Sequence, residues 1–160
     1  MKRIIEIEFY ENYEKVIFYT IRFENDSSEM EKFLDQFDTE ELRDEMDILL
    51  ADLAKIGENG AEIRRFRYEG KMSDNLYAIP LVSCKLRLFC LRISNDLVIL
   101  GNGFRKKDGP YELDLQANYH ASILQKIDKS LKSKINNGTV YIYQREFYGS
   151  TKFTIEDEKL

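Results

Sequence analysis

The residues that could do chemistry in this chain are concentrated in one basic segment. Between Glu62 and Lys107 the sequence carries ten Lys or Arg and four Asp or Glu, a local charge of +6, whereas the formal net charge of all 160 residues is −5. Cations gathered in this way inside an acidic protein suggest a surface that binds an anion. A solvated basic strand face would give the same count, so the charge alone leaves both interpretations open.

The first part of this segment mixes cations with aromatic residues. Phe66 and Tyr68 are interleaved with four basic residues, Arg64, Arg65, Arg67 and Lys71. Cations bind the phosphates of RNA and aromatic rings stack on unpaired bases, so this pattern favours a loop that contacts RNA. A loop that only keeps the protein soluble is the alternative.

A predicted strand and a basic turn supply the remaining cations. Arg87 shares a strand face with Lys85 and Phe89, because side chains alternate between the two faces of a strand. The basic turn, Arg105-Lys106-Lys107, follows the next predicted strand. We therefore expect four cations to converge on one concave face between these strands and a long helix: Lys85, Arg87, Arg105 and Lys107.

The sequence offers no pattern for a metal or a cofactor. One His and two Cys are too few to hold a zinc ion. His120 falls on the apolar stripe of a predicted helix, where we expect it at the edge of the core. Gly101-Asn102-Gly103 lacks the third glycine of a dinucleotide-binding fingerprint.

The cysteines and the N-terminus bear on the compartment. Cys84 and Cys90 lie six residues apart in one predicted strand, roughly 20 Å along its axis, so they cannot form a disulfide with each other. No apolar run approaches the roughly 18 residues needed to cross a bilayer, and the first ten residues alternate Ile with Glu, unlike a signal peptide. We expect a cytoplasmic protein with free thiols and no membrane partner.

Hydrophobic periodicity predicts the elements that would position these side chains. We expect helices from Ser28, where Glu31 completes a capping box, from the N-cap Thr39 to a stop at Gly57, and across residues 112–135. Strands are expected at residues 3–9, 16–23, 76–82, 84–93 and 97–100, with a last hairpin that turns at Gly149-Ser150. The order ββ-αα-βββ-α-ββ, with no internal repeat, predicts a single α+β domain over residues 1–160.

Several runs in this order resemble the RelE/HigB toxins of type II toxin–antitoxin systems, which belong to the RelE/ParE superfamily. The likeness is greatest to the phage-derived, HigB-like branch. It is carried by Leu53-Ala54-Lys55-Ile56-Gly57, Leu76-Tyr77, Leu86-Arg87-Leu88-Phe89, Leu97-Val98-Ile99-Leu100 and Gly103-Phe104-Arg105-Lys106-Lys107, with Ala117 in the following helix. The resemblance implies a RelE-like core over about residues 16–136, a helical hairpin packed on an antiparallel sheet. Extra β-hairpin strands would lie before this core and, at residues 139–160, after it.

The resemblance also implies an activity. Such toxins are endoribonucleases that cut mRNA on the ribosome without a metal, and a cognate antitoxin protein holds them inactive. The ribose 2′-hydroxyl attacks its own phosphate while cations stabilise the phosphorane, and Arg105 would neutralise the leaving oxygen. Tyr111 would stack on a base or accept the hydroxyl proton. The residues implied as catalytic are Arg87, Arg105, Lys107 and Tyr111, and those implied as RNA-binding are Arg64, Arg65, Arg67, Lys71, Lys85 and Lys106.

One run departs from the toxin pattern. The family's Leu-Tyr-Glu-Leu-Arg-like run reads Leu76-Tyr77-Ala78-Ile79-Pro80 here, so its acid and its base are both missing. Pro80 also removes a ladder N–H, which indicates an edge strand or a bulge. Two other functions therefore stay open: a ParE-like or catalytically decayed toxin-fold protein that binds a target without cutting RNA, and a ligand- or partner-binding module that keeps only the fold.

The tail after Asn136 lies outside the resemblance. A two-stranded hairpin is marginal alone, so we expect this tail to pack on the N-terminal hairpin, where it would either extend the sheet or form a small second layer. The acidic run Glu156-Asp157-Glu158 would then lie near the basic groove as a weak electrostatic plug.

Overall fold

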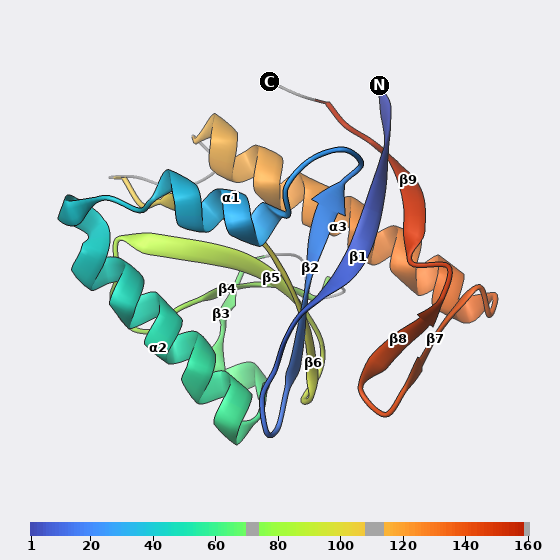
Figure 1. Cartoon of the computed structure of the whole chain (residues 1–160), viewed down its shortest axis with the longest axis horizontal. Helices are drawn as coiled ribbons and strands as arrows, with labels where there is room; N and C mark the ends of the chain where they lie inside the picture. Colours follow the sequence, from blue (N-terminus) through green and yellow to red (C-terminus); the bar gives the residue numbers. More distant parts are fainter. Residues whose placement is uncertain (70–73, 108–113, 159–160) are drawn as a thin grey trace.

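A seven-stranded sheet organises the protein, whose computed structural model describes residues 1–69, 74–107 and 114–158 (Figure 1). From edge to edge its strands are β3 (Arg67–Tyr68), β4 (Leu76–Ile79), β5 (Leu86–Ser94), β6 (Leu97–Arg105), β2 (Ile17–Phe23), β1 (Lys2–Asn12) and β9 (Lys152–Glu156). Neighbours are antiparallel except β2 and β6, which run parallel. The predicted α+β class is confirmed. The expected antiparallel sheet is instead mixed. After β2 the chain passes through the helices and strands β3 to β5 and returns to the end of the sheet where β2 begins, so β6 runs parallel to β2.

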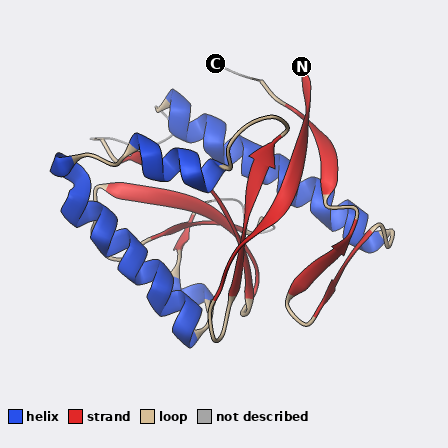
Figure 2. Ribbon diagram, in the orientation of Figure 1, coloured by secondary structure: helices blue, strands red, loops and turns tan. Residues whose placement is uncertain are grey.

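Helices cover both faces of this sheet (Figure 2). Helices α1 (Glu29–Gln36) and α2 (Arg43–Asn59) share one apolar cluster with alternate residues of the strands, among them Leu88 and Leu100. Helix α3 (Leu115–Asn136) packs into a second cluster with Phe89 and Ile99. Two short 3-10 turns, η1 (Glu40–Leu42) and η2 (Ile63–Arg65), flank α2. No helix in the described part of the chain is long and apolar enough to cross a membrane.

The helix ends test the predicted caps. Ser28 caps α1 as expected, since its hydroxyl accepts the backbone N–H of Glu31 at 3.1 Å. Thr39 makes no side-chain cap, and the 3-10 turn η1 precedes α2. The predicted stop at Gly57 is wrong. That glycine lies inside α2, where an added Cβ would lie 2.3 Å from the Tyr13 ring. The helix ends at Asn59, and its C-cap is Gly60, whose φ of 114° favours glycine.

Strand β6 continues well beyond its predicted end at Leu100. Its two glycines do not loosen the strand; they let helices approach both of its faces. A Cβ on Gly101 would lie 2.7 Å from the Leu124 side chain of α3, and one on Gly103 would lie 2.6 Å from the Phe33 ring of α1. Strand β4 is shorter than predicted, because it ends at Ile79, just before Pro80. It lies between β3 and β5, so the predicted edge strand or bulge at Pro80 is wrong.

The C-terminal tail docks on the N-terminal strand, as predicted: β9 pairs antiparallel with β1 and extends the sheet. The predicted turn is wrong. The hairpin of β7 (Val140–Tyr143) and β8 (Glu146–Gly149) turns at Gln144-Arg145, which both have positive φ angles, and Gly149 instead leads the chain from β8 toward β9. Within β7 only Val140 is buried, whereas Tyr141, Ile142 and Tyr143 are exposed.

Candidate functional site

Arg87 and Arg105, the two central cations of the predicted active site, project from opposite faces of the sheet. Arg87 pairs with Phe104 across β5 and β6, and Phe104 belongs to the core on the α3 side. Arg105 is the next residue and pairs with Leu86, which belongs to the core beneath α1 and α2. The predicted convergence on one concave face is therefore wrong. Simple alternation along β6 would place Arg105 on the α3 side with Ile99, but the pairing of β5 and β6 shifts between Leu88 and Cys90, where β6 carries one extra residue, and this shift turns Arg105 to the opposite face.

The Arg87 side chain is buried and hydrogen-bonded within the protein. It is 5% exposed and donates to the backbone carbonyls of Cys84 and Leu86. Burial, with a smaller contribution from the nearby charge of Arg67, lowers the pKa of Arg87. Arg67 binds the same loop, donating to the carbonyls of Pro80 at 2.8 Å and Leu81 at 2.7 Å. The two guanidiniums thus hold the loop between β4 and β5.

Arg105 is engaged on the other face. Its guanidinium forms a 2.7 Å ion pair with Glu41 of η1, and this hydrogen bond lowers the pKa of Glu41. Nearby, the backbone N–H of Lys85 donates to the Glu45 carboxylate at 2.7 Å and lowers the pKa of that carboxyl. Two carboxylates therefore neutralise part of this basic end of the sheet.

The other predicted residues fall into three groups. Lys85, Lys106 and Lys107 are exposed, and the Lys106 N–H donates to the Lys85 carbonyl at 2.6 Å. Arg64 and Arg65 both lie beside Glu62, at 2.9 Å and 3.8 Å. Lys71 and Tyr111 lie outside the described residues.

A second basic site was missed by the sequence analysis. A groove of about 530 Å³ lies between α3 and the edge strand β9. Its lining residues are Lys126, Lys129, Ser130, Ser133, Lys134, Asn137, Thr154, Ile155 and Glu156. Charge counting could have found it, because residues 126–152 carry six Lys or Arg and two Asp or Glu.

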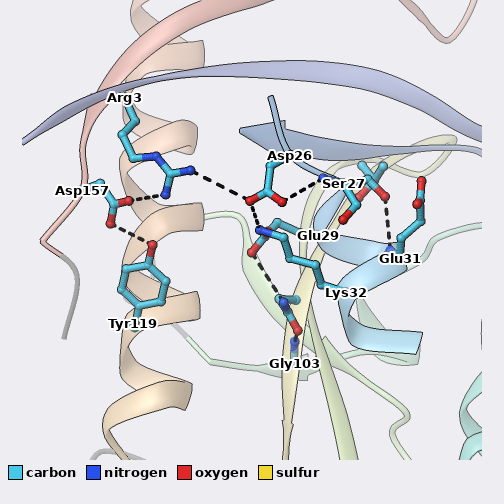
Figure 3. A network of polar contacts seen from close by, with 12 residues as sticks. Arg3, Asp26, Ser27, Glu29, Glu31, Lys32, Gly103, Tyr119 and Asp157 are labelled. Carbon is cyan, nitrogen blue, oxygen red and sulfur yellow. Dashed lines mark hydrogen bonds and ion pairs between the residues drawn. The ribbon is translucent and has the colours of Figure 1, made fainter. Parts of the chain in front are cut away.

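A polar network lies where α1, α3 and the N-terminus meet (Figure 3). Lys32 forms ion pairs with Asp26 and, at 2.9 Å, with Glu29, whose other carboxylate oxygen lies 3.5 Å from the Asn102 amide. The pKa of Asp26 is lowered, mainly by the hydrogen bond that Asp26 accepts from Lys32. His120 is buried as predicted, and neither ring nitrogen has a hydrogen-bond partner among the described residues.

Comparison with known proteins finds no matching family model, no matching curated protein and no matching solved structure. Within the described residues, no group of His, Cys, Asp or Glu could hold a metal ion. What the arrangement offers is binding chemistry: exposed lysines at the end of β6 and a lysine-lined groove beside β9.

Proposed function

We propose that this chain is a protein of the RelE/ParE toxin type that acts by binding its target and does not cleave RNA. The observation that carries this proposal is the placement of Arg87 and Arg105 on opposite sides of the sheet. A single phosphorane needs its cations gathered around one phosphate, whereas these two arginines project from opposite faces of the sheet. Each is also engaged, Arg87 by carbonyls of its own chain and Arg105 by Glu41.

The order of elements supports the toxin-type part of the proposal. Strand β2 is followed by α1 and α2, which pack on one face of the sheet, then by the meander β4-β5-β6 and the helix α3. The runs that resemble the toxins fall on these elements. Target binding would then use the exposed Lys85, Lys106 and Lys107, and a cognate antitoxin would cover them.

Expression in a bacterium without a partner tests both parts. We expect growth to slow while 5′-end mapping finds no new cuts within translated codons of ribosome-bound mRNA. Cells that express the triple variant Lys85→Glu/Lys106→Glu/Lys107→Glu should grow normally. Growth should still slow in cells that express the control, a triple charge reversal at exposed lysines elsewhere, Lys2→Glu/Lys15→Glu/Lys55→Glu. Codon-dependent mRNA cleavage would restore the endonuclease hypothesis and overturn the proposal. Harmless wild-type protein would overturn the toxin-type assignment itself.

A further inference from the structure

The groove between α3 and β9 lies beside an open sheet edge. β9 is the outermost strand, and its far side pairs with no strand in the described residues. Toward β1, the Asp157 N–H donates to the Met1 carbonyl at 2.8 Å, and Thr151 accepts from the Ile7 N–H at 2.9 Å. Because N–H and C=O groups alternate along an antiparallel strand, those of Lys152, Thr154 and Glu156 point away from β1.

Those outward backbone groups face the groove. The Lys126 ammonium, from α3, donates to the Glu156 carbonyl at 3.0 Å, which fixes the direction of that carbonyl. Thr154, Ile155 and Glu156 line one wall, and a single face of α3 lines the other. A segment placed in the groove would therefore occupy the next strand position of the sheet.

The charges of the groove select what fits there. Lys126, Lys129 and Lys134 line it, against one carboxylate from Glu156. The three lysines span about 12 Å along α3 at 1.5 Å per residue. Three alternate side chains of an extended strand span about 13 Å, and they all point to one side. Three acidic residues at alternate positions would therefore cover about the same length as the three lysines, whose long side chains can adjust to them.

We propose that this groove binds an extended acidic segment of a partner protein, which adds to the β9 edge as a further strand. Main-chain hydrogen bonds to Thr154 and its outward neighbours provide affinity, and the lysines select acidic side chains. Lys126 exchanges its carbonyl contact for a carboxylate of the incoming segment. The site is separate from the lysines of the proposed function, so either inference can fail without the other.

Fluorescence anisotropy with a labelled peptide of alternating Glu and Thr tests the proposal on the full chain. We expect Lys129→Glu/Lys134→Glu to weaken binding about tenfold or more, because two attractive charges become repulsive. The control Lys15→Glu/Lys55→Glu, at exposed lysines outside the groove, should bind like the wild type. A thermal melt of each variant shows whether it is folded.

A second measurement needs no variant of the protein. Methylation of alternate backbone nitrogens of the peptide removes its main-chain donors, and binding should fall about tenfold if the peptide adds as a strand. Binding that survives either the lysine reversal or the methylation overturns the proposal. A uridine 12-mer that binds more tightly than the peptide, and whose binding is lost on the same lysine reversal, would assign the groove to nucleic acid and would also overturn the proposal. A dimer that Thr154→Pro abolishes and Thr154→Ala retains would assign the edge to a second copy of this chain and overturn it too.

Discussion

The Arg3 guanidinium and the Asp157 carboxylate form a 2.8 Å ion pair between residues 154 positions apart in the chain. The Asp157 side chain is fully buried, and its other oxygen accepts the Tyr119 hydroxyl of α3 at 2.7 Å (Figure 3). One carboxylate thus joins the first strand, the long helix and the C-terminal tail. The acidic tail was expected near the basic segment that ends at Lys107; instead Asp157 binds Arg3, and Glu156 lines the groove beside α3.

Replacement of this carboxylate should destabilise the whole protein. Asp157→Ala leaves Arg3 without its closest charge partner and the Tyr119 hydroxyl without an acceptor, so we expect a loss of about 2–3 kcal/mol in the free energy of unfolding. Urea denaturation followed by circular dichroism measures it. The exposed neighbour provides the control, and Glu158→Ala should change stability by less than about 0.5 kcal/mol. Equal effects at the two positions would contradict a structural role for Asp157.

The β7–β8 hairpin should be held in place by one aromatic residue. The buried Phe147 ring packs edge-on against Tyr19 with ring centroids 4.9 Å apart, whereas Tyr148 stacks on Tyr141 at the surface. Phe147→Ala should cost about 3 kcal/mol, because it removes a buried ring. Tyr148→Ala should cost about 0.5 kcal/mol or less. Chemical denaturation of the two variants side by side would show the difference, and a small effect for Phe147→Ala would mean that the hairpin does not depend on this contact.

Local signals in the sequence predicted those parts of the fold that depend on neighbouring residues. The N-cap Ser28, the three helices and the buried position of His120 follow from side-chain chemistry within a turn or two of the chain. The short strand β3 and the third strand of the C-terminal tail were not predicted. Long-range packing decided the rest. Gly101 and Gly103 carry the usual signal of a strand end, yet both lie inside β6 because α3 and α1 press against them.

The candidate site was harder to predict because a strand's register decides which side chains meet. The register shift between Leu88 and Cys90 gives β6 one extra residue, which reverses the expected face of Arg105 relative to Arg87. The groove beside β9 depends on a contact between α3 and the edge of the sheet that no local pattern contains. Only the excess of basic residues between Lys126 and Lys152 indicated it.

Arg87 should matter for stability. Arg87→Ala removes the donor that binds the Cys84 and Leu86 carbonyls, so we expect a loss of about 2 kcal/mol on unfolding. Lys85→Ala, at an exposed position two residues earlier, should stay within about 0.5 kcal/mol of the wild type. The midpoints of thermal and urea unfolding compare the two. An Arg87→Ala protein as stable as the wild type would show that the loop between β4 and β5 does not need this guanidinium.

His120 should make stability depend on pH. Burial, with a smaller contribution from the charge of Lys32 and an opposing one from Asp114, lowers the pKa of His120 to about 4. An unfolded histidine titrates near 6.5, so between about pH 6.5 and 4 the unfolded chain binds a proton that the native state does not. The contribution of the neutral ring to the free energy of unfolding is therefore fully present above about pH 6.5. It falls as the pH drops toward 4, by roughly 3 kcal/mol at most. His120 is the one histidine of the sequence, so the variant His120→Leu should flatten this part of the profile. Urea midpoints at intervals from pH 4.5 to 7.5 measure it, and a variant whose stability falls as steeply as that of the wild type would assign the slope to carboxylates.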